Sequence, residues 1–146
     1  MNEDVHFYEV NLRWNSERKG ILGLPVLPTE TEVTTPPDFP KGMKYLWTLE
    51  HLFVTAVNRC LMATFLAIDE NSRFAFFSFE CNAVGIVGKI DGKLAVTEIA
   101  LKPKVLIPTT QLEEQLKKIL EMSKRECLIT NSIITTISLE PSIVVQ

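Results

Sequence analysis

The sequence predicts an α+β fold, with mainly antiparallel sheets packed on a long buried central helix and a second, amphipathic helix. Segments with strand and helix patterns follow one another in the order strands, helix, strands, helix, strand. Because the helices do not alternate with single strands, a doubly wound parallel sheet is disfavoured. Neither GxGxxG nor GxxxxGK[ST] opens a helix, so nucleotide-loop chemistry is not supported.

Size and composition favour one globular domain covering residues 1–146. Hydrophobic residues make up 46% and charged residues 23% of the chain, which is ordinary for a protein with a single core. The net charge of -3, without a basic stripe, argues against a nucleic-acid partner. Residues 1–4 carry no basic leader, so we expect a cytoplasmic protein. Apolar stretches such as 52–57 and 94–101 are interrupted early, so we expect no membrane partner.

The N-terminal third is typical of a small β meander. Residues 5–14 partly alternate, which predicts a half-buried strand. Its apolar face would be formed by Tyr8, Val10, Leu12 and Trp14. After a turn at 15–20, residues 21–24 form the expected hairpin partner and 29–34 a short edge strand, separated by two prolines that a central ladder would not accept.

A long apolar helix is expected next, over residues 48–68. Three prolines and a glycine between residues 36 and 42 form a loop that cannot be helical, and this loop ends before the helix begins. Apolar side chains then occupy more than one face of the helical projection. This pattern indicates a central helix buried on several sides.

Residues 73–87 and 89–103 are rich in strand formers, and the turn at 90–93 contains an Asp-Gly pair that suits positive φ angles. We therefore expect two or three long antiparallel strands. Residues 111–122 predict an amphipathic helix, 127–132 a short helical continuation and 133–146 a closing strand broken around Pro141.

The three cysteines, Cys60, Cys81 and Cys127, are the groups with the clearest potential chemistry. An odd number without a CxxC pair argues against a disulfide framework. A structural zinc site needs about four ligands, and only His6 and His51 could join the cysteines, so we expect no metal. A thiol reacts as its thiolate and needs a cation or hydrogen-bond donors to lower its pKa. Otherwise a buried cysteine is a small apolar group, which is how we interpret Cys81.

Three segments resemble the OsmC/Ohr family, named for osmotically induced protein C and organic hydroperoxide resistance protein. They are Leu12-Arg13-Trp14 with Arg18-Lys19-Gly20, Trp47-Thr48-Leu49-Glu50-His51-Leu52-Phe53 leading to Cys60, and Gly92-Lys93-Leu94 with Thr97-Glu98-Ile99 followed by the segment from Cys127 to Ser132. The resemblance covers nearly the whole chain. It implies an intertwined homodimer with active sites at the subunit interface, and an enzyme that reduces organic hydroperoxides.

Carried over by position, the resemblance implies that Cys60 is the peroxidatic thiolate and Cys127 the resolving thiol. Glu50 would be the acidic partner and Arg18 the cation, with no bound cofactor and an external dithiol as reductant. Other candidate cations are Arg13, Arg59 and Lys41. The chain departs from the family pattern at Leu49 and Leu128, where proline is usual, and these departures bear on efficiency and substrate.

Helix geometry tests the position of Glu50 relative to Cys60. Ten residues along an ideal helix correspond to about 15 Å of rise and about 80° of rotation, so the two side chains cannot touch within one helix. If Glu50 assists the thiolate, it must act from another chain. The alternative function is a noncatalytic dimer that binds small apolar ligands or has a structural role under stress. A guanidinium within reach of the Cys60 sulfur would distinguish the two.

Overall fold

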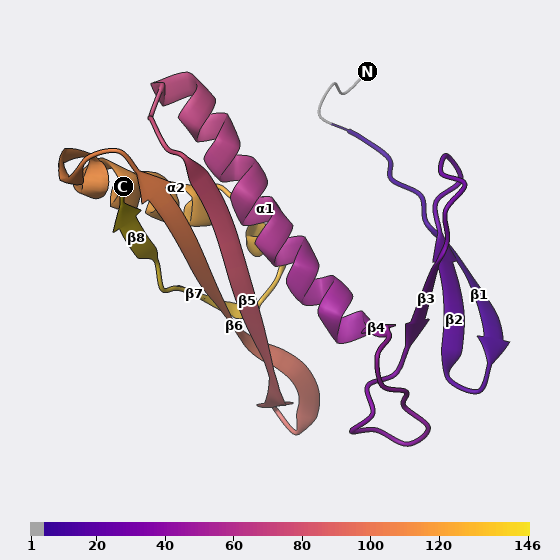
Figure 1. Cartoon of the computed structure of the whole chain (residues 1–146). Coiled ribbons are helices and arrows are strands. Elements are labelled where there is room, and N and C mark those ends of the chain that lie inside the picture. Colours follow the sequence, from indigo (N-terminus) through magenta and orange to yellow (C-terminus); the bar gives the residue numbers. More distant parts are fainter. Residues whose placement is uncertain (1–4) are drawn as a thin grey trace. The chain divides into compact units, whose positions relative to one another are not determined.

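The structure is a computed structural model that describes residues 5–146. The chain divides into two compact units, Met1–Leu52 and Phe53–Gln146, and each is described by itself (Figure 1). The boundary falls just after the first residues of the long helix, α1 (Leu49–Ser72).

The N-terminal unit is a four-stranded sheet in the order β1-β2-β3-β4. Its strands are β1 (Asn11–Ser16), β2 (Lys19–Gly23), β3 (Thr31–Thr34) and β4 (Trp47–Thr48). The first three pair antiparallel, which confirms the predicted meander. However, β3 also pairs with β4 in parallel, so it is not an edge strand.

The first predicted strand begins later than expected, because residues 5–10 have no regular structure. Its apolar face is also not half-buried. Tyr8 is 90% exposed, Val10 63%, Leu12 68% and Trp14 76%. The expectation was wrong because, within the described part of the N-terminal unit, nothing covers this alternating apolar face.

Helix α1 begins with a reciprocal cap. Thr48 Oγ1 accepts the backbone N–H of His51 at 3.2 Å, and His51 Nδ1 accepts the backbone N–H of Thr48 at 3.1 Å. Histidine thus takes the place that glutamate or glutamine has in a capping box. The cap satisfies two of the backbone donors at the start of α1 and fixes where the helix begins.

The helix ends four residues later than predicted and is buried along one stripe only. Val57, Leu61 and Phe65 are fully buried, whereas Leu49 is 64% exposed. The expectation of burial on several sides was therefore wrong, because both core clusters of the C-terminal unit use the same stripe of α1, which carries Val57, Leu61 and Phe65. Among the helices of residues 5–146, α1 alone is long and apolar enough to span a membrane by length and composition, which corrects the expectation of early interruption.

The C-terminal unit is built on a long antiparallel hairpin, β5 (Ser78–Ile90) and β6 (Lys93–Ile107). Asp91 and Gly92 form its turn with φ values of 50° and 79°, as the Asp-Gly pair predicts. The closing segment is indeed broken around Pro141, into β7 (Thr136–Leu139) and β8 (Ser142–Val145). Both pair with β6 in parallel.

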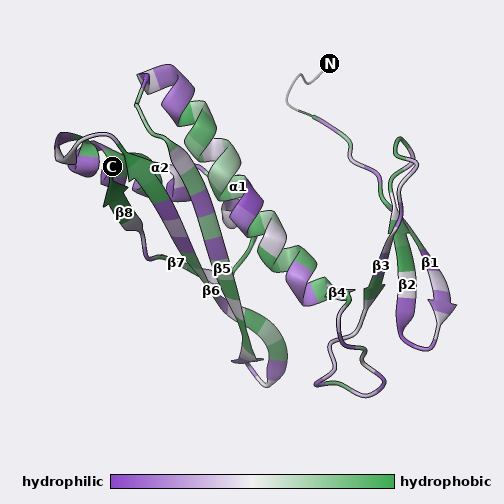
Figure 2. Cartoon of the chain, in the orientation of Figure 1, coloured by the Kyte–Doolittle hydropathy of each residue, from purple (hydrophilic) through white to green (hydrophobic). Residues whose placement is uncertain are grey.

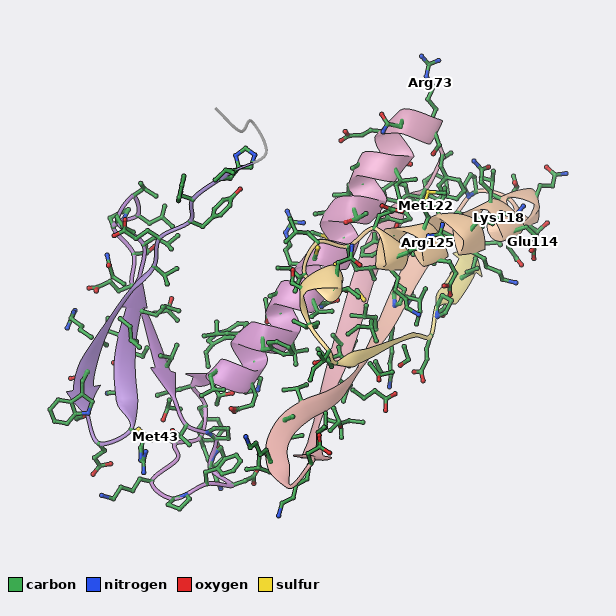
Figure 3. All side chains as sticks on the ribbon, turned by 180° about the vertical axis from the view of Figure 1, so that it is seen from behind. Met43, Arg73, Glu114, Lys118, Met122 and Arg125 are labelled. Carbon is green, nitrogen blue, oxygen red and sulfur yellow. The ribbon has the colours of Figure 1, made fainter. Side chains whose placement is uncertain are left out.

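Helix α2 (Glu113–Arg125) follows a short 3₁₀ turn at Thr110–Leu112 and packs on the same side of the sheet as α1. One core cluster joins residues of both helices, of β6 and of the loop after α1, namely Phe65, Phe74, Val105, Ile107, Leu116, Ile119 and Leu120. A second joins α1 to β6 and β7 through Val57, Leu61, Ile99, Leu101 and Ile137. Hydrophilic and hydrophobic residues alternate along β5 and β6 (Figure 2). The charged side of α2, with Glu114, Lys118 and Arg125, carries no core residue (Figure 3).

Candidate active site

The fold brings Cys60 and Cys127 together, although 67 residues separate them in the sequence. Cys60 lies on α1 beside the buried Leu61, and Cys127 lies two residues after the end of α2. The two thiols lie close enough for each to shift the pKa of the other. Both are free thiols, so the structure shows the reduced pair.

The two sulfurs differ in access to solvent. Cys127 is 1% exposed, whereas Cys60 is half-buried. Asn58 Nδ2 donates to the carbonyl of Cys81 at 2.9 Å and ties α1 to β5 close to this point. The position of Cys60 relative to the sheet is therefore set by a hydrogen bond as well as by packing.

The loop carrying Cys127 is held as a helical turn by its own hydrogen bonds. The Cys127 carbonyl accepts the Asn131 N–H at 3.0 Å, and the Leu128 carbonyl accepts the Ser132 hydroxyl at 2.8 Å. The turn ends in the short 3₁₀ helix η2 (Thr130–Ser132), so the predicted helical continuation is confirmed. The backbone of this turn contributes to lowering the pKa of Cys127.

The surroundings shift the pKa values of the two thiols in opposite directions. Burial raises the pKa of Cys60, and its interaction with Cys127 adds to the rise. Burial alone would also raise the pKa of Cys127, but the neighbouring Cys60, Thr130 and Ile129 outweigh it and lower that pKa. In the resting pair, a single negative charge is therefore better accommodated on Cys127.

Glu50 lies in the first turn of α1, where a carboxylate interacts favourably with the helix dipole. Its Oε2 is buried, and no group within residues 5–146 donates a hydrogen bond to it. Glu50 and Cys60 both belong to α1, so about 15 Å of helix separates them and their side chains cannot touch within one chain. The structure thus leaves a buried carboxylate oxygen that a donor from outside the chain could satisfy.

Arg18 lies in the turn between β1 and β2. The turn is held by a hydrogen bond from Trp14 Nε1 to the carbonyl of Glu17 at 3.0 Å. Arg18 borders an open cavity of about 540 Å³ within the N-terminal unit. The cavity is lined mainly by apolar side chains, including Leu12, Trp14, Leu22, Val33, Leu49 and Leu52.

The other candidate cations differ from Arg18 in their partners or position. Arg13 Nη2 contacts both carboxylate oxygens of Glu30, at 3.1 and 3.2 Å, so this guanidinium already has an acidic partner. Arg59 precedes Cys60 on α1 and is exposed. Lys41 is also exposed, in a loop where its own φ is 62°.

Cys81 and His51 have structural roles in the described chain. Burial raises the pKa of Cys81 in β5 to about 11, which agrees with its interpretation as a packing residue. His51 caps α1. Residues 5–146 contain no group of three or more His, Cys, Asp or Glu side chains that could hold a metal ion.

Sequence reasoning missed two hydroxyl residues beside the thiols, Thr130 and Thr64. The buried Thr130 Oγ1 has no hydrogen-bond partner within residues 5–146, and Thr64 Oγ1 donates to the Cys60 carbonyl at 2.9 Å. The sequence spacing could have identified both, because each threonine follows its cysteine by three or four residues and so lies one turn further along a helical segment.

The comparisons with known proteins agree on one fold. An OsmC-like protein of unknown function from Vibrio cholerae is 25% identical, with a TM-score of 0.85 over 94% of this chain and 99% of that chain. An organic hydroperoxide resistance protein from Elizabethkingia anophelis, solved with thiocyanate bound, is 16% identical, with a TM-score of 0.74 over 99% of this chain and 100% of that chain.

A similar match is the organic hydroperoxide resistance protein OsmC from Legionella pneumophila, which is 10% identical, with a TM-score of 0.72 over 98% of this chain and 100% of that chain. No curated protein matches the sequence. The family described as OsmC-like protein matches residues 47–142. This match includes Glu50, Cys60 and Cys127 and covers more than half of the chain, which therefore belongs to the OsmC-like protein family.

Proposed function

We propose that the protein is a thiol-dependent peroxidase that reduces organic hydroperoxides with Cys60 and Cys127. The observation that carries this proposal is the pair of neighbouring free thiols on α1 and on the loop after α2. A pair in contact can form a disulfide without a large rearrangement, as a two-cysteine peroxidase requires. The organic hydroperoxide resistance proteins among the similar structures support the same reaction class.

The proposed reaction begins at Cys60, because its sulfur is the more accessible of the two. Its thiolate attacks one peroxide oxygen, the O–O bond breaks, and the alkoxide leaves and takes a proton to become an alcohol. Cys60 is now a sulfenic acid. The Cys127 sulfur attacks the Cys60 sulfur, water leaves, and a disulfide forms. An external dithiol supplies the two electrons that restore both thiols.

Activation of Cys60 needs a positive charge that the C-terminal unit does not supply. Burial raises the pKa of Cys60, and the surroundings favour a thiolate on Cys127 instead. We propose that the guanidinium of Arg18 from a second copy of the chain approaches Cys60, and that Glu50 holds this guanidinium in place. The buried and unpartnered Glu50 Oε2 would then have a donor.

A homodimer would also cover apolar surface that the single chain leaves exposed. Leu12, Trp14 and Leu49 are each more than 60% exposed. Alternate apolar residues on a strand are typical of a face that packs against another surface. The exposed apolar face therefore supports the proposed homodimer and its sharing of residues between subunits, and a protein that is monomeric at micromolar concentration would contradict it.

Turnover of peroxide with a dithiol tests the proposal directly. Consumption of cumene hydroperoxide and of hydrogen peroxide should be measured with dihydrolipoamide as reductant. We expect faster turnover of the organic peroxide, because the cavity beside Arg18 is mostly apolar. Cys60→Ser should abolish turnover and Cys127→Ser should block disulfide formation, whereas Cys81→Ser serves as the matched cysteine control. A rate equal to that of Cys60→Ser would refute the peroxidase.

The same cavity favours a second candidate function, the noncatalytic binding of a small apolar ligand. Its volume of about 540 Å³ lies within the range of small-molecule sites. This function predicts a bound apolar molecule that organic extraction releases from the purified protein, and no peroxide turnover. Substitution of Leu22 by Asp in the cavity wall should then abolish binding, whereas Cys60→Ser should leave it unchanged.

A further inference from the structure

Thr48 joins the N-terminal sheet to the start of α1. It is the last residue of β4, where it pairs in parallel with Thr34, and its hydroxyl also caps the helix. Thr48 is 1% exposed. Because water does not reach it, its backbone N–H and its hydroxyl need partners from the protein. These partners therefore fix where the first turn of α1 begins.

The imidazole of His51 supplies both partners through one nitrogen. Its Nδ1 lies 3.1 Å from the backbone nitrogen of Thr48 and 2.9 Å from Thr48 Oγ1. A backbone N–H can only donate, so the Nδ1 that accepts it carries no hydrogen. The Thr48 hydroxyl then donates its own hydrogen to Nδ1, while its oxygen accepts the backbone N–H of His51 at 3.2 Å. The geometry thus requires a neutral imidazole with its one hydrogen on Nε2.

Protonation of His51 would remove this cap. An imidazolium carries a hydrogen on each nitrogen, so Nδ1 would present an N–H to the backbone N–H of Thr48. The buried donor of Thr48 would lose its acceptor, and a positive charge would lie at the helix N-terminus, where the helix dipole disfavours it. Glutamine, which a capping box also uses at this position, accepts at every pH.

The surroundings of the imidazole in the N-terminal unit do not favour its charged form. An open cavity of about 260 Å³ is lined by His51 together with Tyr45, Leu46 and Trp47. The Trp47 ring and the imidazole meet at 80°, with their centroids 6.1 Å apart. Tyr45 is the other titratable residue of this lining, which contains no carboxylate. Glu50 is the charged neighbour on α1 itself, but adjacent residues of a helix do not face each other.

Glu50 lies between the two capping residues, and its position depends on them. Glu50 Oε2 is buried and has no hydrogen-bond partner within residues 5–146. No donor in the described chain therefore holds that oxygen, and the backbone of the first turn sets where it lies. The hydrogen bonds between Thr48 and His51 fix that backbone on both sides of Glu50.

We propose that His51 is a positioning residue for Glu50, and that it holds Glu50 in place for the guanidinium only while its imidazole is neutral. This inference rests on the proposed function, because it gives the proposed site a dependence on pH. It predicts that peroxide turnover falls on acidification by more than the titration of the thiols alone would cause.

The matched variant is His51→Gln, which keeps an acceptor for the Thr48 N–H but takes up no proton. Cumene hydroperoxide turnover of both proteins is measured with dihydrolipoamide from about pH 8 to about pH 5, the range in which imidazoles titrate. The thiols of protein and reductant are the same in both reactions, so their titration cancels in the ratio of the two rates. We expect the rate of the unmodified protein, relative to His51→Gln, to fall about three- to tenfold across this range, because the hydrogen bonds of the cap are lost.

Two further comparisons separate positioning from a merely structural role. His51→Ala should be slower at every pH, and His51→Gln should restore the lost activity. In the Glu50→Ala background, the rate ratio with and without His51→Gln should stay constant with pH, because the carboxylate that His51 positions is gone. His6→Gln is the control, since His6 is the other histidine of the chain, is exposed and precedes β1. It should leave the pH dependence unchanged.

A rate ratio that stays constant with pH, or that falls equally with and without Glu50, would overturn the role of His51. Nitrogen NMR of the labelled imidazole locates its hydrogen without any peroxide, and a hydrogen on Nδ1 at about pH 8 would overturn the cap itself. Failure of the proposed function would appear differently, as the absence of Cys60-dependent turnover in every variant while the imidazole hydrogen is on Nε2.

Discussion

Mixing two inactive variants tests whether one active site uses residues of two chains. Cys60→Ser removes the attacking thiol, and Glu50→Ala removes the carboxylate that would hold the guanidinium. Ten residues of α1 separate these positions by about 15 Å, so one chain cannot supply both to the same site. The two variants should therefore complement each other when their subunits exchange.

The size of the recovery follows from the geometry. Loss of a charge-assisted hydrogen bond of about 1.5–3 kcal/mol predicts that Glu50→Ala alone is at least about tenfold slower than the unmodified protein. In a mixed dimer, one site combines the intact Cys60 with the intact Glu50, and the other site lacks both. Random exchange of equal amounts makes about half of the dimers mixed, so activity should recover to about a quarter of the unmodified rate.

The assay is cumene hydroperoxide consumption before and after subunit exchange, with each variant alone incubated in the same way. Light scattering checks that the mixture remains dimeric. Exchange can be confirmed by mass spectrometry of the intact mixed dimer. If mixed dimers form and activity stays at the level of the separate variants, each site is contained in one chain and the reasoning from α1 is refuted.

Three further predictions concern single features of the fold. The pKa of Cys81 is about 11, against an ordinary value of 9.0. Cys81 should therefore react with iodoacetamide at pH 8 about 100-fold more slowly than an ordinary thiol. Its reaction should become faster as the pH rises toward 11. Ordinary labelling of the tryptic peptide 74–89 at pH 8 would contradict this. A Cβ at Gly85 would lie 2.5 Å from Val54 Cγ2, so Gly85→Ala should lower the free energy of unfolding by about 1–3 kcal/mol in urea, with partial rescue by Val54→Ala. An equal loss in both backgrounds would exclude that contact. Thr48→Ala should cost about 1 kcal/mol of thermal stability by removing the cap shared with His51, and Thr48→Ser should cost little.

Much of the fold could be predicted because periodicity and turn chemistry are local properties. The Asp91-Gly92 turn, the amphipathic α2 and the break at Pro141 each follow from a few neighbouring residues. Burial was harder to predict. The apolar residues of β1 and α1 indicate that these faces pack against another surface, but the sequence pattern does not identify whether that surface belongs to the same chain or to another.

The candidate site could likewise be predicted only in part from the sequence. Cys60, Cys127 and Glu50 could be identified from motif resemblance, and the impossibility of contact between Glu50 and Cys60 follows from helix geometry alone. The direction of the pKa shift of Cys127 could not be predicted in advance. It depends on the conformation of the loop after α2, which exists only once that loop is folded.

The sequence by itself determined the order of the helices and strands, the position of each cysteine on them and the charge of the chain, because these depend on residues close together along the backbone. Only the tertiary structure decided that α1 and the loop after α2 bring two distant thiols close together, and that Cys127 is buried while Cys60 stays accessible. The physical reason is that packing α1 and α2 on one side of the same sheet sets both the distance between the sulfurs and the burial of each.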